Sequence, residues 1–126
     1  MSETPARLEL RTESRADAGA EVTIVHVAGE VDLASAPELA ATLKAEATPH
    51  VRLVLDLTGV PFMDSSGLRE LLVFSRELGD RLAVVVEPDS AVRHLLDIAE
   101  VAERINVQPS EAEALAAIEK GARGRG

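Results

Sequence analysis

Residues 53–68 join a strongly apolar segment to a small polar cluster and read LVLDLTGVPFMDSSGL. The segment 51–58 is the most apolar of the chain and is predicted to be a central β-strand. It leads into Asp64-Ser65-Ser66-Gly67, where a helix is predicted to begin at about Ser66 and to end at Leu78. A hydroxyl at the start of a helix is either a cap for a free backbone N–H or a group available for modification. The choice between these two roles therefore determines what this loop does.

The rest of the chain alternates predicted strands and predicted helices. Alternating or β-branched side chains predict further strands at residues 8–11, 22–28, 82–86 and 104–108. Hydroxyl residues followed by apolar residues at helical spacing predict further helices from Ser35, from Pro88-Asp89-Ser90 and from Ser110 to about Lys120. This order predicts an α/β fold, with a mixed, largely parallel sheet of four to five strands and about four helices.

Local composition indicates where these elements begin and end. The polar, Gly-containing segment 14–20 predicts a turn. Ser35 with Glu38, and Ser110 with Glu113, are predicted capping boxes at two helix starts. The 126 residues are predicted to form a single domain, 1–126, with a core from about residue 8 to residue 120. The Gly- and Arg-rich segment 121–126 is predicted to be a disordered tail.

The composition restricts the classes of partner. A net charge of −9 argues against nucleic acid or an anionic membrane as the main partner. Aromatic residues make up 2% of the chain, which leaves no platforms for stacking the bases of a nucleic acid. Of the two phenylalanines, Phe62 is expected to pack at the edge of the core with Met63. The absence of cysteine excludes disulfides and thiolate metal sites. Without a signal-peptide pattern or an apolar run near the ~18 residues of a membrane span, the protein is expected to be cytoplasmic.

Catalytic motifs are missing from the sequence. The residues around Ser65 do not form the Gly-x-Ser-x-Gly turn of a serine hydrolase, and no histidine is placed to act as its base. A Gly-x-Gly-x-x-Gly motif and a P-loop are also absent. The three histidines, His26, His50 and His94, lack metal-ligand spacing with one another. The sequence therefore predicts no catalytic residues, no cofactor and no metal site.

Two polar loops each follow a predicted strand. Gly29-Glu30-Val31-Asp32 follows the strand at 22–28, and Asp64-Ser65-Ser66-Gly67 comes after the strand at 51–58. If these strands are parallel neighbours, both loops emerge at the same end of the sheet, where α/β proteins usually place their sites. Two acidic side chains would then lie near two hydroxyls at a helix start.

A phosphate on Ser65 would act as a switch at this place. The unpaired N–H groups and the positive dipole end of the helix would tolerate it. It would add roughly −1.5 to −2 charge beside Asp64, Glu30 and Asp32. A partner that docks on the unmodified face would be repelled by the phosphorylated one.

Three segments in this order resemble the anti-sigma-factor antagonist family, the bacterial members of the STAS domain. They are Val27-Ala28-Gly29-Glu30-Val31-Asp32, Val54-Leu55-Asp56-Leu57 and Phe62-Met63-Asp64-Ser65-Ser66-Gly67-Leu68. The resemblance extends from about Leu8 to Lys120. It implies a STAS-like fold, with helices flanking the central sheet mainly on one side. It also implies that the chain has no enzymatic activity, since the ATP chemistry belongs to the partner.

The resemblance implies a partner-switching cycle centred on Ser65. An anti-sigma factor that is also a serine kinase phosphorylates the first Ser after the Asp, here Ser65, and thereby releases the antagonist. A serine phosphatase restores the unphosphorylated form, which captures the kinase and frees the sigma factor. By position, the partner-binding surface comprises Gly29, Glu30, Asp32, Asp64, Ser66, Gly67 and Leu68. Arg69-Glu70 departs from the small or apolar residues common in close relatives, which leaves the identity of the partner open.

Each of these assignments has a purely structural alternative. Ser65, Ser66 or Asp64 could cap the helix, and Glu30 and Asp32 could serve only the turn. The leucine stripe is expected to belong to the core rather than to the docking surface, and consists of Leu68, Leu71 and Leu72. The alternative function is a structural STAS subunit, of a signalling assembly or a lipid-transport complex, in which Ser65 is not modified.

Overall fold

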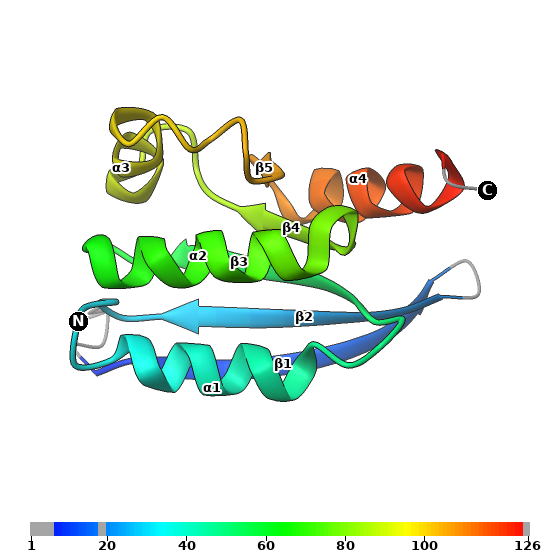
Figure 1. The fold of residues 1–126 in the computed structure, drawn as a ribbon, viewed down its shortest axis with the longest axis horizontal. Helices are drawn as coiled ribbons and strands as arrows, with labels where there is room; N and C mark the ends of the chain where they lie inside the picture. The colour runs from blue at the N-terminus through cyan, green and yellow to red at the C-terminus, as the bar shows by residue number, and fades with distance from the viewer. Residues whose placement is uncertain (1–6, 18–19, 125–126) are drawn as a thin grey trace.

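The computed structural model of the protein describes residues 7–17 and 20–124 (Figure 1). Its elements are, in chain order, β1 (Glu9–Asp17), β2 (Ala20–Ala28), α1 (Ala36–Glu46), β3 (Arg52–Gly59), α2 (Ser65–Leu78), the short 3₁₀ helix η1 (Gly79–Arg81), β4 (Leu82–Val85), α3 (Ala91–Ile98), β5 (Val107–Gln108) and α4 (Glu111–Gly124). In this part of the chain five strands form one sheet in the order β1-β2-β3-β4-β5. β1 pairs antiparallel with β2, and the other neighbours pair parallel. The predicted α/β fold with a mixed, largely parallel sheet is confirmed.

Helices cover the two faces of the sheet unequally (Figure 1). On one face, Leu43 of α1 and Leu71 of α2 share a buried cluster with Leu55 of β3. On the other face, Ile118 of α4 shares a smaller cluster with Val54, the neighbour of Leu55 in β3. Successive strand residues point to opposite faces, so β3 contributes to both layers. Burying each such side chain stabilises the fold by about 1.5–3 kcal/mol.

The central strands and the end of α2 agree with their sequence patterns. All residues of β4 are buried, as expected for a strand that is covered on both faces. Helix α2 ends at Leu78 as predicted, and its C-cap residue Gly79 has φ 56°, in the left-handed region that favours glycine. None of the helices in the described ranges is long and apolar enough to cross a membrane.

Strand β1 is longer than its sequence indicates. The sequence predicts a strand at residues 8–11 and a turn at 14–20, whereas β1 continues to Asp17 and pairs with β2 as far as Ala20. The predicted turn is therefore wrong for residues 14–17 and for Ala20, which begins β2, and residues 18–19 lie outside the described residues. Backbone hydrogen bonds to a single neighbour hold an edge strand, so its side chains need not be apolar. The polar side chains of residues 14–17 therefore carry no strand pattern, although their backbone pairs with β2.

Two elements near the C-terminus also differ in length from their predictions. The backbone N–H groups of Arg104 and Ile105 donate to Val101 O at 2.9 and 3.2 Å. This turn shortens the strand predicted at 104–108 to β5 alone. Helix α4 runs past Lys120 to Gly124, so the prediction of a disordered tail is wrong for residues 121–124. Residues 125–126 lie outside the described residues.

Candidate functional site

The loops after β2 and β3 lie side by side at the carboxyl end of the sheet. A parallel bridge joins Val31 to Met63. Val31 N–H donates to Phe62 O, and Asp64 N–H donates to Val31 O, both at 3.0 Å. As the parallel order of β2 and β3 predicts, residues 29–32 and 64–67 are therefore neighbours.

Asp64 is the residue that caps α2. Its backbone is extended (φ −103°, ψ −171°), and its Oδ1 accepts a hydrogen bond from Ser66 N–H at 2.8 Å. Helix α2 therefore begins at Ser65, slightly earlier than predicted. Ser65 is exposed, and its hydroxyl has no hydrogen-bond partner among the described residues. Of the possible caps, Asp64 fills the role and leaves the Ser65 hydroxyl accessible.

The residues that follow Ser65 are less accessible. Ser66 is half-buried, and Leu68 is half-buried against the main core, to which Leu71 belongs fully. Gly67 is buried, and a Cβ at this position would lie 2.6 Å from Met63 Cγ and 2.7 Å from Val31 Cγ1. Gly67 thus allows α2 to approach the bridge between the two loops, and its role lies in backbone packing.

We expect Gly67→Ala to destabilise the protein by about 1–3 kcal/mol, the usual cost of overpacking. Alanine favours a helix over glycine by about 1 kcal/mol, so helix propensity alone predicts the opposite sign. Urea denaturation followed by circular dichroism measures the difference, with Ser66→Ala as the neighbouring control. A Gly67→Ala variant more stable than the wild type would show that the contacts with Val31 and Met63 do not constrain the loops.

Asp32 closes the turn that leads into α1. Its Oδ1 accepts the N–H groups of Ala34 and Ser35, both at 3.0 Å. Hydrogen bonds from the backbone and the hydroxyl of Ser35 hold the pKa of Asp32 below its ordinary value. The predicted capping box of Ser35 and Glu38 is wrong, because Ser35 makes no side-chain cap bond and its Oγ accepts Asp32 N–H at 3.0 Å instead. Asp32 therefore has the turn role, whereas the neighbouring Glu30 is exposed.

The glycine and acidic residues of the site have different roles in the structure. Gly29 is buried with φ 103°, a backbone conformation that strains other residues, so it shapes the exit from β2. Glu30 is exposed, while Asp32 and Asp64 are half-buried and hold turns. The acidic groups lie on the loops that flank the exposed hydroxyl of Ser65.

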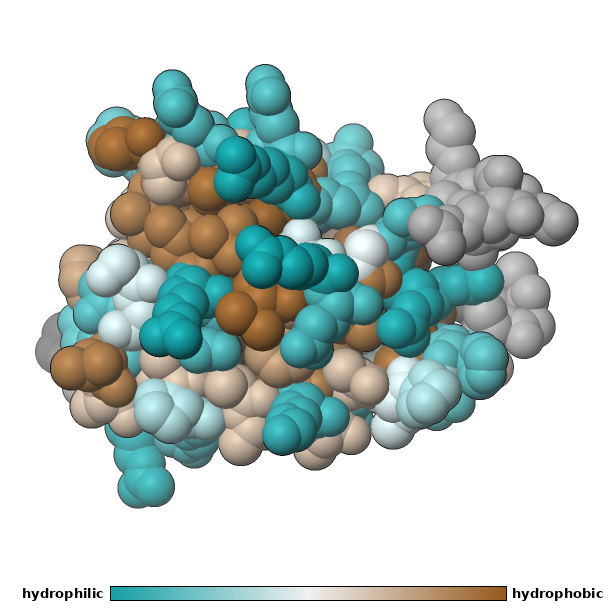
Figure 2. Space-filling view, viewed as in Figure 1, coloured by the Kyte–Doolittle hydropathy of each residue, from teal (hydrophilic) through white to brown (hydrophobic). Residues whose placement is uncertain are grey.

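Large apolar side chains are exposed on both loops. Leu33 is 78% exposed and Phe62 is 48% exposed. The expectation that Phe62 packs at the core edge is wrong, while Met63 is buried as expected. Ile98, at the end of α3, is 66% exposed, and Figure 2 shows further apolar surface over α2 and α3 at this end of the molecule. Sequence reasoning missed Leu33 because a single leucine in a loop carries no periodic signal. Exposed apolar groups beside polar ones are typical of protein-binding surfaces.

Comparison with known proteins assigns the chain to a domain family. The STAS domain model matches residues 12–114, which include both loops. The crystal structure of an anti-sigma factor antagonist from Mycobacterium paratuberculosis is similar, with a TM-score of 0.76 and 27% identity over 94% of this chain and 99% of that chain. No match was found among curated protein sequences.

Two further solved structures share the fold. The phosphorylated form of SpoIIAA, a Bacillus cell fate determinant, has a TM-score of 0.58 and 20% identity over 87% of this chain and 99% of its own. The murine anion transporter Slc26a9 has a TM-score of 0.60 and 21% identity over 79% of this chain but 18% of the transporter chain. Because the family model covers most of the sheet and the helices as well as both loops, this chain belongs to the STAS domain family.

Proposed function

We propose that this STAS domain is an anti-sigma factor antagonist whose binding is switched off by phosphorylation of Ser65. The observation that carries the proposal is the arrangement at the start of α2, where Asp64 caps the helix and the Ser65 hydroxyl is exposed. A kinase needs a hydroxyl that can enter its active site without melting the substrate's fold, and Ser65 meets this requirement better than half-buried Ser66. Similarity to an anti-sigma factor antagonist at 27% identity supports the same assignment.

The proposed partner is an anti-sigma factor that is also a serine kinase. The docking surface consists of the two joined loops and the first turn of α2. Glu30 and Asp32 lie on the loop after β2, Asp64, Ser66 and Leu68 lie next to Ser65 in the chain, and Gly29 and Gly67 set the backbone. Exposed Leu33 and Phe62 add apolar area to this surface. Binding of the unphosphorylated form removes the kinase from its sigma factor, and a serine phosphatase regenerates this form.

Electrostatics explain why a phosphate on Ser65 ends binding without unfolding the domain. The free N–H groups and the positive end of the α2 dipole stabilise an anion at the first helical residue. Seen from the partner, however, the phosphate adds roughly −1.5 to −2 charge to a surface that already carries Glu30, Asp32 and Asp64. A partner surface that packs closely on these loops loses its fit and gains repulsion.

The proposal includes a cytoplasmic location and no enzymatic activity of the chain itself, since the kinase supplies the ATP chemistry. The alternative is a structural STAS subunit, of a signalling assembly or a lipid-transport complex, in which Ser65 stays unmodified. One observation favours this second class, namely that a murine anion transporter contains a segment of the same fold. The two classes differ in whether Ser65 is a kinase substrate.

Intact-mass measurement after incubation with ATP and a candidate anti-sigma serine kinase from the same organism tests the proposal. We expect a gain of one phosphate per chain, which a serine phosphatase removes. A kinase that binds the chain and phosphorylates other substrates, but leaves the mass of this chain unchanged, would favour the structural subunit.

A further inference from the structure

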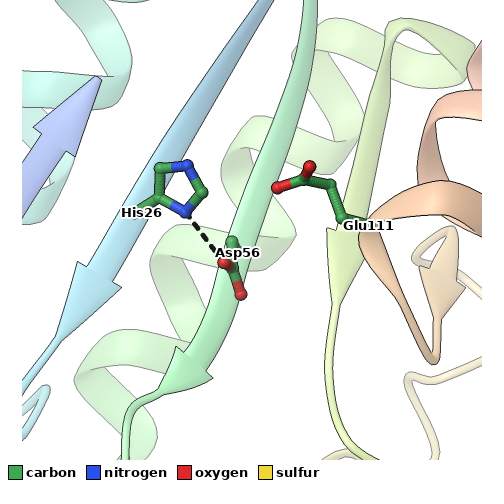
Figure 3. A group of neighbouring side chains, drawn as sticks. All are labelled: His26, Asp56 and Glu111. Carbon is green, nitrogen blue, oxygen red and sulfur yellow. Dashed lines mark hydrogen bonds and ion pairs between the residues drawn. The ribbon is translucent and has the colours of Figure 1, made fainter. Parts of the chain in front are cut away.

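The sheet face opposite α1 and α2 carries a second group of polar side chains. Helix α4 covers only part of this face, and beside α4 the side chains of His26 on β2 and Asp56 on β3 lie at directly paired positions. Figure 3 shows Glu111, the first residue of α4, directing its carboxylate toward this pair. One ligand atom from each of the three residues lies within 4.8 Å of the others. Three elements thus bring an imidazole and two carboxylates to one point.

We propose that His26, Asp56 and Glu111 bind a divalent transition-metal ion, for which Zn²⁺ is the probe. Zinc is bound in proteins by imidazole nitrogen at about 2.0–2.1 Å and by carboxylate oxygen at about 2.0–2.2 Å, in a tetrahedron. Ligand atoms of such a tetrahedron lie about 3.3 Å apart. His26 Nδ1 and Asp56 Oδ2 are 2.8 Å apart and need to open slightly, while Glu111 offers a carboxylate oxygen within 4.8 Å of both.

Glu13 of β1 supplies the support that a metal-binding histidine requires. Its Oε1 lies 3.1 Å from His26 Nε2, the ring nitrogen on the side away from Asp56. Metal-ligating histidines almost always donate the hydrogen on the second nitrogen to a carboxylate or carbonyl, which fixes the orientation of the ring. An ion on Nδ1 would replace the hydrogen shared with Asp56 and leave the bond to Glu13 intact.

The charges and the accessibility of the cluster suit a cation. Glu13, Asp56 and Glu111 contribute three carboxylates, and Arg15 pairs with two of them, Glu13 at 2.8 Å and Glu111 at 3.4 Å. The side chains of His26 and Asp56 are 19% and 16% exposed.

A route from solvent also exists. A cavity of about 390 Å³ is lined by both His26 and Asp56, together with residues of β1 and the end of β3. A zinc ion at this place would have room for a water as its fourth ligand, since only three protein ligands converge. Bound there, the ion would fasten the start of α4 to β2 and β3, on the sheet face opposite α1 and α2. Sequence spacing did not predict this site because its ligands come from separate elements.

Titration calorimetry of the full chain with zinc chloride, in a non-chelating buffer at pH 7, tests the proposal. We expect one ion per chain and a rise in the unfolding midpoint of at least about 4 °C at a zinc concentration of 100 Kd. His26→Gln and Glu111→Gln should each weaken binding at least tenfold. Glu13→Gln should weaken it by about 10–100-fold, as for other partners of ligating histidines.

Matched controls distinguish this site from zinc bound by any surface histidine. His50→Gln and His94→Gln remove the other two histidines, both exposed, and should leave the affinity unchanged. Wild-type protein that takes up no zinc would show that the cluster is only an ion-pair network between α4 and the sheet. Zinc binding that persists in both His26→Gln and Glu111→Gln would equally overturn the proposal. If His26→Gln fails to fold, Glu111→Gln alone retains the test, because Glu111 lies at a helix start and is 33% exposed on its side chain.

Discussion

Replacing Ser65 by alanine is expected to abolish phosphorylation by the proposed anti-sigma kinase and to leave the fold intact. The Ser65 hydroxyl is exposed and makes no hydrogen bond with the described residues, so its removal deletes no interaction that holds the domain together. Alanine also favours a helix more than serine does, by less than about 1 kcal/mol. Incorporation of labelled phosphate from ATP measures the effect, and thermal unfolding verifies that stability is preserved.

Ser66→Ala is the matched control for this experiment. Ser66 carries the same hydroxyl one position later, but it is half-buried and its N–H is held by the Asp64 cap. We expect Ser66→Ala to be phosphorylated at a rate close to that of the wild type. Labelling that persists in Ser65→Ala and disappears in Ser66→Ala would show that Ser66, and not Ser65, is the residue that is phosphorylated.

Ser65→Glu is expected to weaken binding of the kinase at least tenfold, which corresponds to about 1.4 kcal/mol. The substitution places a permanent negative charge at the first helical residue, beside Asp64 and the loop that carries Glu30 and Asp32. A charged group that is buried in an interface without an opposite charge loses its hydration, which opposes binding. Because a glutamate carries less charge than a phosphate, the loss of affinity should be smaller than that caused by phosphorylation itself.

A control for this substitution needs the same charge at a distant place. Ser14 is exposed on β1 and pairs with Thr23, near the end of β2 that lies away from the two loops. Ser14→Glu should therefore bind the kinase as the wild type does, in a calorimetric or surface-based titration. Equal affinity of Ser65→Glu and the wild type would mean that charge at this loop is not the switch, even if Ser65 is phosphorylated.

Most of the architecture follows from patterns within short segments. The buried strands β3 and β4 have continuous apolar runs, and α2 has leucines at helical spacing, so their type and order are readable from the chain. The sequence pattern predicts too short a strand for β1, because the pairing of β1 with β2 depends on backbone groups that every residue carries. The sequence pattern predicts too long a strand for β5, because Arg104 and Ile105 form a turn with Val101 instead of pairing with β4.

Some features of the candidate site are likewise predictable from local sequence, and others depend on the tertiary structure. The sequence alone identifies a hydroxyl pair behind an acid at a helix start and a second acidic loop, because these are local patterns. Which residue caps α2 depends on the backbone angles of Asp64, and the accessibility of Ser65 depends on the segments packed around it, so only the folded chain reveals both. The exposure of Leu33 and Phe62, and the convergence of His26, Asp56 and Glu111, are likewise visible only in the assembled structure. The physical reason is that contacts between distant segments depend on strand register and helix docking, which no short stretch of residues encodes.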